Sequence, residues 1–401
     1  MTFFPQKVEI YWGGHFIYQK GIEILIILYK KLNIIKAMFV NSTLKNIKPY
    51  KLSLHKAWEL EDKSKALKLD WNEASVPPSP KVLQRVREVI EHEMLNWYPD
   101  TGNKSLIEKL ANYNDIPTEC TQYFASSDAL HEYIVRAFVG ISDRVLIVGP
   151  TYDNFRAVAE SNGAQIQPYF LNDDFTLDYR QFKRDLTLIR PKITYIVNPN
   201  NPTGTFHKAE DLIDLVNSFP EILFIIDEAY YEFSKSSIKN EAIIRQNVII
   251  SRTFSKAFAL ASFRIGYCIS NPTIINILNS IRNPKNVSLF AQVAAEAALD
   301  DSTYMWNYVD EVVAAKDIFA KRLMTLKWVK PFIGEGNFIM IKFLESNLKA
   351  KFMEYLESHQ IFIRDYSHIA ATPNCARITI GTREQMDFVW KAIQEFDKKN
   401  K

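Results

Sequence analysis

Four short apolar runs, most of them rich in isoleucine and valine, recur along the middle of the chain, with longer helical or polar stretches between them. They are Val145–Val148, Ile193–Val197, Ile222–Ile226 and Val248–Ile250. Runs of this length without polar alternation are typical of strands that are buried on both faces of a sheet. The pattern therefore predicts an α/β domain with a mostly parallel sheet.

Helical patterns lie on both sides of these runs. Ser79-Pro80 is typical of a helix start, because serine caps the first turn and proline fits the first helical position. Later in the chain, a second group of helices and strands predicts a smaller α+β unit. Its expected elements are a long helix over 303–326, strands over Phe338–Phe343 and Arg377–Ile380, and a helix over about Ala350–His359.

Glycine is scarce, with only 12 residues among 401. Past the N-terminal segment the one Gly-x-Gly is Gly334-Glu335-Gly336, and Ile339 occupies the place of the third glycine of a dinucleotide fingerprint. No glycine is followed by lysine, so the P-loop motif is absent as well. The sequence therefore excludes two common ways of binding a nucleotide phosphate.

Charge, cysteine and histidine content bear on nucleic-acid binding, on the redox compartment and on metal binding. The net charge is +3, and the first 50 residues alone carry +5, so the rest of the chain gives no support for nucleic-acid binding. Cys120, Cys268 and Cys375 are odd in number and far apart, which favours buried thiols in a reducing compartment. We therefore expect a cytoplasmic protein. The seven histidines show no ligand spacing, so we expect no metal site.

Residues 1–45 differ from the rest and are expected to form a poorly packed extension that is not required for the fold. Their most apolar run, Ile22–Tyr29, contains Glu23 and is far shorter than the ~20 residues that cross a bilayer. We therefore expect no membrane span. A basic helix on a membrane surface is the functional alternative. Met38 is a hypothetical native start, which the intact mass of the native protein would test.

Polar residues of complementary kinds follow three of the predicted strands. They are Asn198–Gly204, Asp227–Tyr230 and Ser251–Lys256, with Arg264 eight residues beyond Lys256. Ligands of open parallel sheets bind outside the carboxyl ends of the strands. We therefore expect an amide, a carboxylate, a phenol, hydroxyls, an amine and a guanidinium to meet at one edge of the sheet.

Each of these features alone has an ordinary structural explanation, as a turn, a helix cap or a solvated lysine. Their coincidence is what one aldehyde cofactor with a phosphate would require. An amine forms the imine, a carboxylate pairs a protonated ring nitrogen, and hydroxyls with an arginine hold a phosphate without a glycine-rich loop.

Three segments, N-P-N-N-P-T-G, D-E-A-Y and S-R-T-F-S-K-A-F-A-L-A-S-F-R-I-G, resemble the fold type I pyridoxal-phosphate enzymes, and specifically the histidinol-phosphate aminotransferase family. The resemblance runs in order from about Asn46 to Phe396. It implies a large domain over 81–303 with a mostly parallel, seven-stranded-type sheet. It also implies a small α+β domain made of 46–80 with 304–401, and pyridoxal 5'-phosphate as the cofactor.

The same resemblance assigns roles around the cofactor ring. Lys256 would be the Schiff-base lysine and would then carry the proton between substrate and cofactor. Asp227 would pair the pyridinium nitrogen. Asn201 and Tyr230 would hydrogen-bond the ring hydroxyl oxygen, and Tyr152 would stack on the ring.

The resemblance also assigns the phosphate end of the cofactor. Thr253, Ser255 and Arg264 would bind the phosphate, with the arginine giving a bidentate contact. Tyr98 would reach the phosphate of the neighbouring subunit's cofactor, which implies a homodimer with shared sites.

One loop departs from the family pattern at the cofactor phosphate. The usual Gly-Ser/Ala-Asp/Glu reads Ser126-Ser127-Asp128 here, with serine at the glycine position. Ser127 and Asp128 can still offer backbone N–H groups at a helix start. Serine tolerates a positive φ poorly, so the path of the loop is an open question.

The substrate side also combines matches and a departure. Arg377 matches the arginine that clamps an α-carboxylate, and Arg364 matches one that contacts the distal phosphate of the family's substrates. The family's Asn-Glu-Asn-Pro is replaced by Asn72-Glu73-Ala74-Ser75, preceded by Trp71. Since Asn72 belongs to the region that lines the substrate side, a substrate other than histidinol phosphate is plausible.

The predicted function is pyridoxal-phosphate-dependent transamination of an anionic, phosphorylated amino donor, with 2-oxoglutarate and glutamate as the partner pair. A threonine-phosphate decarboxylase shares nearly every cofactor contact and differs in which bond at Cα is broken. An aromatic or general amino-acid aminotransferase is a third reading. A non-catalytic binding module is a fourth, against which Lys256, Asp227 and Arg264 argue.

Overall fold

The computed structural model describes residues 41–44, 47–48 and 56–400. Its contacts divide the chain into two units, Met1–Ile47 and Lys48–Lys401. In the first unit, the described residues form one 3-10 turn, Ser42–Leu44 (η2). The predictions for Ile22–Tyr29 and for Met38 concern residues outside the described part.

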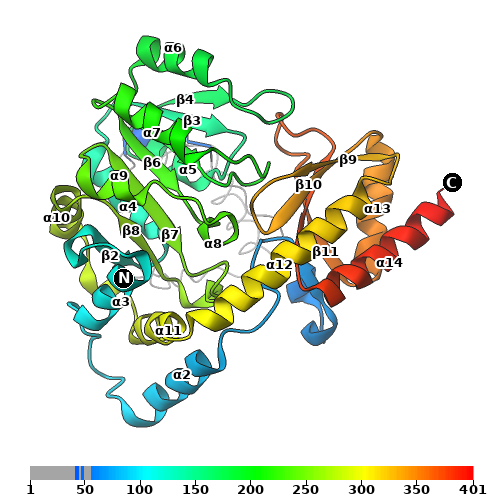
Figure 1. Ribbon diagram of the computed structural model, residues 1–401, viewed down its shortest axis with the longest axis horizontal. Helices are drawn as coiled ribbons and strands as arrows, with labels where there is room; N and C mark the ends of the chain where they lie inside the picture. Colours follow the sequence, from blue (N-terminus) through cyan, green and yellow to red (C-terminus); the bar gives the residue numbers. More distant parts are fainter. Residues whose placement is uncertain (1–40, 45–46, 49–55, 401) are drawn as a thin grey trace, which may run out of the picture. The chain divides into compact units, whose positions relative to one another are not determined.

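The second unit contains a seven-stranded sheet in the order β2-β8-β7-β6-β5-β3-β4 (Figure 1). Neighbouring strands from β4 across to β7 are parallel, and β8 is antiparallel to both β7 and β2. The predicted mostly parallel sheet is therefore confirmed. The strands are β2 (Thr121–Phe124), β3 (Arg144–Gly149), β4 (Gln165–Phe170), β5 (Ile193–Val197), β6 (Leu223–Asp227), β7 (Val248–Thr253) and β8 (Gly266–Ile269).

Both faces of this sheet are buried, as the apolar runs predict. Alternate residues of one strand belong to two different core clusters: Leu146 and Val148 pack into one, and Val145 and Ile147 into the other. Every residue of β5 and of β7 is buried. In contrast, β4 is an edge strand with exposed positions and contains Pro168. An edge strand tolerates proline because on one side it has no neighbouring strand that needs a backbone N–H.

Helices connect and cover these strands. Ser79 caps the first large helix as predicted, because its side chain accepts a hydrogen bond from the Lys81 backbone and Pro80 follows it. Helices of this part are α2 (Pro80–His92), α3 (Lys104–Asn114), α4 (Ser127–Phe138), α5 (Asn154–Ser161), α6 (Tyr179–Ile189), α7 (Ala209–Ser218), α8 (Tyr231–Ser234), α9 (Lys239–Ile244), α10 (Pro272–Ile281) and α11 (Leu289–Leu299).

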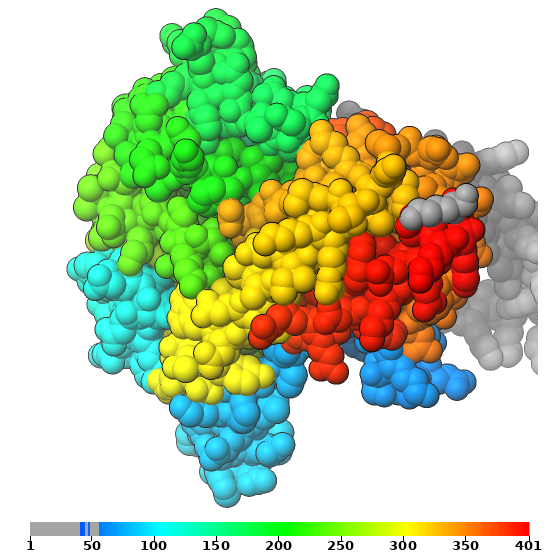
Figure 2. Space-filling view, turned by 45° about the vertical axis from the view of Figure 1, so that its right-hand side comes forward, coloured from blue at the N-terminus to red at the C-terminus, as the bar shows by residue number. Residues whose placement is uncertain are grey.

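A second, five-stranded sheet has the order β1-β11-β12-β10-β9. Its first strand comes from far earlier in the chain: Leu67 pairs with Ile361 in the parallel β1–β11 ladder. Long helix α12 contacts both α8 and α14, and Figure 2 shows the yellow segment that contains it between the green and red parts. The elements are β1 (Leu67–Leu69), α12 (Ser302–Leu323), β9 (Val329–Ile333), β10 (Phe338–Phe343), α13 (Ser346–Ser358), β11 (Ile361–Asp365), β12 (Cys375–Thr379) and α14 (Arg383–Lys399).

Some predicted boundaries are wrong by a few residues. The strand expected over Arg377–Ile380 runs over Cys375–Thr379, and the helix expected from Ala350 begins at Ser346. Polar or small residues at these ends carry no apolar signal, although the backbone continues the element. We keep as a proposal the division into a large domain (81–303) and a small domain (46–80 with 304–401).

A buried ion pair links β7 to Glu228, the residue that follows β6. Arg252 on β7 donates to Glu228 from Nε at 2.9 Å and from Nη2 at 2.7 Å. Its Nη1 donates to the Asn114 side chain at 2.6 Å. Both charged side chains are almost fully buried, and such charges depend on each other because neither is solvated by water.

Replacing one partner of this pair should destabilise the fold strongly. Arg252→Met leaves Glu228 buried without its cation, so we expect the free energy of unfolding to fall by about 3–5 kcal/mol, measured by urea denaturation. The matched control is Arg85→Met, because the Arg85–Glu88 pair is 41% exposed on both sides, and its loss should be under about 1 kcal/mol. Equal losses in the two variants would contradict this account.

Candidate active site

The carboxyl ends of the central strands meet as expected from the sequence. Val197 of β5 pairs with Asp227 of β6, and Asp227 pairs with Ser251 of β7. A cavity of about 970 Å³ opens at this edge and extends to the second sheet. The predicted site residues that line it are Ser127, Asp128, Tyr152, Asn201, Asp227, Tyr230, Thr253, Ser255, Lys256, Arg264, Arg364 and Arg377.

Lys256 lies in the loop after β7 with its amine inside the cavity. Its Nζ donates a hydrogen bond to the backbone oxygen of Trp71 at 2.8 Å. Burial lowers the pKa of Lys256 to about 8, with the charge of Arg377 adding to the effect and Glu73 opposing it. A larger fraction of this amine is therefore neutral near pH 7 than in a solvated lysine, as a nucleophile or proton carrier requires.

Asp227 ends β6 and is 4% exposed. The Tyr195 hydroxyl donates to its Oδ2 at 2.6 Å, and the Ala229 backbone N–H donates to its Oδ1 at 3.1 Å. Burial raises the pKa of the Asp227 carboxyl, while the nearby His131 opposes this rise. Hydrogen bonds thus fix the carboxylate, and a cationic ligand group beside it would compensate for its burial.

Tyr195 and His131, which lie beside this carboxylate, are not among the site residues predicted from the sequence. His131 Nε2 lies 3.7 Å from Asp227 Oδ2 and 3.1 Å from the Ser251 hydroxyl. Tyr195 interrupts an otherwise nearly apolar strand, and this phenol was the one available signal. His131 is a single histidine on a helix, a pattern that predicts nothing by itself.

Hydroxyl side chains and the N-terminus of a helix line another part of the cavity. The Thr253 hydroxyl donates to Ser255 Oγ at 2.9 Å, and Arg264 Nη2 donates to Asp128 Oδ2 at 3.2 Å. Ser127 is the first residue of α4, whose free backbone N–H groups and positive dipole end favour an anion. These donors suit a phosphate.

The loop at Ser126 keeps the conformation that glycine would adopt. Ser126 has a φ of 95°, and its hydroxyl caps α4 by accepting a hydrogen bond from the Ala129 backbone at 3.2 Å. Opposite it, Gly266 leaves no room for a side chain, since a Cβ there would lie 2.7 Å from the Ser127 nitrogen. The strained serine is thus compensated by its cap, and the open question about the loop's path is answered.

Two arginines of the second sheet face the cavity. Arg377 donates from Nη1 to the Tyr366 hydroxyl at 2.8 Å and to Asn201 Oδ1, and from Nη2 to the Asp70 backbone oxygen at 2.6 Å. Within the described residues, Arg377 Nε and Arg364 Nη1 are buried without a hydrogen-bond partner. Buried guanidinium donors of this kind favour an anionic ligand.

Three predicted residues are not part of the cavity lining: Ser126, described above, Asn72 and Tyr98. Asn72 is 1% exposed and donates from Nδ2 to the Tyr230 hydroxyl at 2.9 Å, while its Oδ1 accepts from Thr379 at 3.0 Å. Its observed contact is thus with a cavity-lining side chain. Tyr98 is 76% exposed in the segment after α2, with Lys285 Nζ 4.4 Å from its ring centre.

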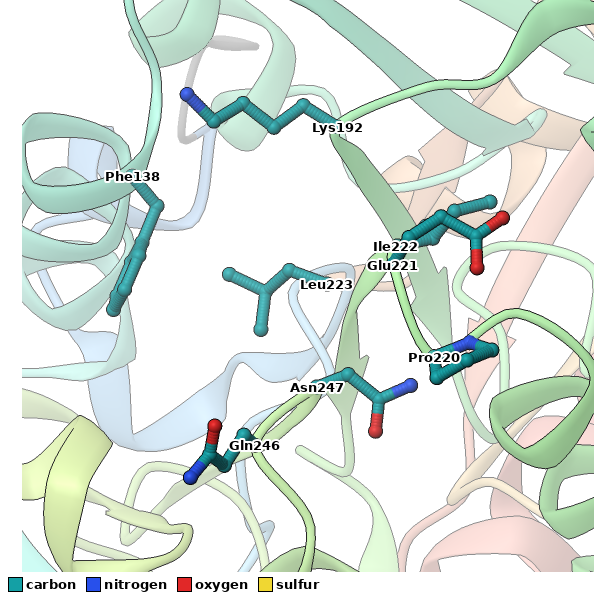
Figure 3. Close-up of a pocket in the computed structure, with 8 residues that line it drawn as sticks. All are labelled: Phe138, Lys192, Pro220, Glu221, Ile222, Leu223, Gln246 and Asn247. Carbon is teal, nitrogen blue, oxygen red and sulfur yellow. The ribbon is translucent and has the colours of Figure 1, made fainter.

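A smaller hollow of about 170 Å³ lies at the opposite ends of the same strands, near the starts of β5, β6 and β7 (Figure 3). Its Lys192 amine is paired with Asp143 at 2.7 Å. Among the described residues, no cluster of three or more histidine, cysteine or acidic side chains could hold a metal ion. In the same part of the chain, no helix is long and apolar enough to span a membrane.

Comparisons with known proteins agree with this geometry. The chain is 44% identical over 366 residues to a dihydroxyacetone phosphate transaminase of Campylobacter jejuni, which covers 90% of this chain and 98% of the relative. It is 29% identical over 329 residues to a histidinol-phosphate aminotransferase of Thermoanaerobacter pseudethanolicus, covering 82% of this chain and 92% of the relative.

The fold also matches solved structures. Histidinol-phosphate aminotransferase from Sinorhizobium meliloti, in complex with pyridoxal-5'-phosphate, superposes with a TM-score of 0.81 at 24% identity, covering 91% of this chain and 99% of that one. The family model for aminotransferase class I and II matches residues 64–393. The expected fold type I architecture and pyridoxal phosphate cofactor are thereby confirmed, and the chain belongs to the class I and II aminotransferases.

Proposed function

We propose that this aminotransferase exchanges an amino group between a small phosphorylated substrate and the pair glutamate and 2-oxoglutarate. The observation that carries the proposal is the pair Arg364 and Arg377. Both line the cavity that holds Lys256, and each has a buried donor nitrogen without a partner among the described residues. Two guanidinium groups near one amine suit an amino compound with an anionic group.

The residues of the cavity fit pyridoxal phosphate. When bound, this cofactor supplies an aldehyde that reacts with amines and a ring that accepts the electrons released at the substrate's Cα. Thr253, Ser255 and Arg264, with the start of α4, would hold its phosphate. Asp227 would pair the ring nitrogen, and Lys256 would bind the aldehyde carbon.

Further cavity residues would fix the ring itself. Tyr152 would stack on it, and its hydroxyl is already held by Asp128 Oδ1 at 3.0 Å. Asn201 and Tyr230 would contact the ring hydroxyl oxygen. Asn72 would act through Tyr230, since the hydrogen bond between them fixes the position of the phenol.

In this proposal, Lys256 transfers the proton. Its lowered pKa makes the amine able both to take a proton from the substrate's Cα and to return it. The backbone oxygen of Trp71 accepts a hydrogen bond from this amine and orients it. Asp227 would keep a proton on the ring nitrogen, because its buried carboxylate is held in place by hydrogen bonds from Tyr195 and the Ala229 backbone.

Dihydroxyacetone phosphate is the substrate we favour. The Campylobacter jejuni relative named for this compound is 44% identical over nearly its whole length. Amination of its ketone gives an amine-bearing carbon next to a phosphooxymethyl group, as in histidinol phosphate. The two amines differ in one substituent, hydroxymethyl against imidazolylmethyl. Trp71, a bulky side chain in the cavity wall, favours the smaller one.

Histidinol phosphate is the second candidate, because the aminotransferases named for it share 28–31% identity with this chain. A threonine-phosphate decarboxylase and an aromatic or general amino-acid aminotransferase stay as alternatives. The three cysteines are buried and free, which favours a reducing compartment such as the cytoplasm.

A panel of substrates tests this proposal. The purified enzyme, with pyridoxal phosphate and glutamate, should convert dihydroxyacetone phosphate faster than the imidazole ketone phosphate, followed as 2-oxoglutarate released. Arg364→Met should lower kcat/KM for phosphorylated substrates by about 10- to 100-fold, because a charge-assisted contact is lost. The control is Arg184→Met, an exposed arginine of α6. Carbon dioxide from threonine phosphate, or no turnover of phosphorylated compounds, would contradict the proposal.

We also propose a homodimer. Apolar side chains in the segment just after α2 are exposed: Met94 by 61%, Leu95 by 51%, Trp97 by 72% and Tyr98 by 76%. Figure 2 shows the light-blue segment that contains α2 protruding from the molecule. Exposed apolar side chains that cluster in one segment are typical of a protein interface. In such a dimer Tyr98 could reach the neighbouring subunit's cofactor phosphate.

A charge in this surface should dissociate the dimer. Trp97→Glu should reduce the mass in solution, measured by light scattering, from twice the 46.5 kDa of one chain to that of a single chain. Leu188→Glu is the matched control, since Leu188 is 77% exposed on α6, and it should leave the mass unchanged. A monomeric wild type would contradict the proposal.

A further inference from the structure

Lys68 is a third cation of the second sheet that faces the cavity, and no function has been assigned to it. It is the middle residue of β1 and lines the cavity with a side chain that is 23% exposed. The segment that contains it also provides Trp71, whose backbone oxygen holds Lys256. Lys68 therefore lies on the substrate side of the cavity.

The register of the sheet places the three cations on one face. Lys68 pairs with Phe362 in the β1–β11 ladder, and Arg364 follows Phe362 by two residues. Side chains two residues apart on a strand point to the same face. Arg364 in turn pairs with Arg377 across the β11–β12 ladder. Lys68, Arg364 and Arg377 thus form a row across three strands.

The first two of these cations both lie close to the Trp71 ring. The Lys68 amine is 5.3 Å from the centre of the Trp71 ring, and the Arg364 guanidinium carbon is 6.0 Å from it. An anion beside this ring would therefore be within reach of both side chains. The indole also gives that place an apolar wall, which strengthens charge interactions by excluding water.

The hydrogen bonds of Lys68 leave it able to bind a ligand. Its Nζ donates to Asp70 Oδ1 at 2.8 Å and to Glu73, and these two carboxylates hold the amine in position. An ammonium group has three protons to donate, so one is left within the described residues. Arg364 Nη1 likewise has no partner there.

We infer that Lys68 is a specificity-determining residue that binds the substrate's phosphate together with Arg364. This inference rests on the proposed function. A phosphate monoester carries close to two negative charges at neutral pH, and a carboxylate carries one. The second cation therefore favours a phosphate over the singly charged γ-carboxylate of glutamate, whose α-carboxylate would be satisfied by Arg377.

Binding is the right measurement, because Lys68 also affects the chemistry. Burial is the main cause of the lowered pKa of Lys256, and the charge of Lys68 contributes to it. A rate change in a Lys68 variant would mix the two effects. Glycerol 3-phosphate, which has a phosphate but neither amine nor carbonyl, and glutarate, a dicarboxylate, bind without reacting.

The test compares these two probes on the cofactor-loaded enzyme by calorimetry. Lys68→Met and Lys68→Gln should each raise the Kd of glycerol 3-phosphate about tenfold and leave the Kd of glutarate within about twofold. Lys68→Gln keeps hydrogen bonding to Asp70 and Glu73, so it controls for a fault in folding. Lys65→Met is the matched control, because Lys65 is 69% exposed and outside the cavity lining.

The outcomes separate the inference from the proposed function. Unchanged binding of glycerol 3-phosphate in both Lys68 variants would overturn the inference and leave the proposed function standing. Equal weakening of both probes would also overturn it, since it would show a general effect on the cavity. A wild-type enzyme that neither binds glycerol 3-phosphate nor converts phosphorylated substrates would overturn both.

Discussion

The buried carboxylate of Asp227 is the constraint on which the candidate site depends. It stands at the carboxyl end of β6, is 4% exposed, and is fixed by hydrogen bonds from Tyr195 and the Ala229 backbone. Burying an ionised carboxylate is costly unless a partner charge is present. A cationic ligand group beside Asp227 would supply that charge, and Lys256 lines the same cavity.

The rest of the fold serves to place complementary groups around this carboxylate. Parallel pairing of β5, β6 and β7 brings Asn201, Asp227 and Lys256 to one edge, because each follows or ends a strand of the same direction. The second sheet supplies cations of its own. Its β1 strand pairs a segment near residue 68 with one near residue 362, so segments far apart in the sequence together form the substrate side.

Much of this arrangement is predictable because the relevant signals are local. The strands β3, β5, β6 and β7 were predicted since buried strands of a parallel sheet are continuously apolar. The site residues after them were predicted because each lies in a recognisable segment. In contrast, β1 has only three residues and β4 is a half-exposed edge strand, so neither shows a pattern above its surroundings.

The residues that the sequence argument missed are those whose role comes only from tertiary contacts. Tyr195 and His131 matter because they lie beside Asp227, and Lys68 because a parallel ladder sets it near Arg364. For Ser126, in contrast, the sequence shows that the position is unusual, and the structure shows how it is accommodated. Its replacement of glycine was visible in the sequence, but its φ of 95° and its capping hydrogen bond required the structure.

The most direct test of the account is to find the amine that binds the cofactor. The enzyme loaded with pyridoxal phosphate is treated with borohydride, digested, and examined by mass spectrometry for the lysine that carries the reduced cofactor. We expect the label on Lys256, whose amine lines the cavity and has a lowered pKa. A label on Lys68, the other lysine of the cavity lining, or no label at all, would contradict it.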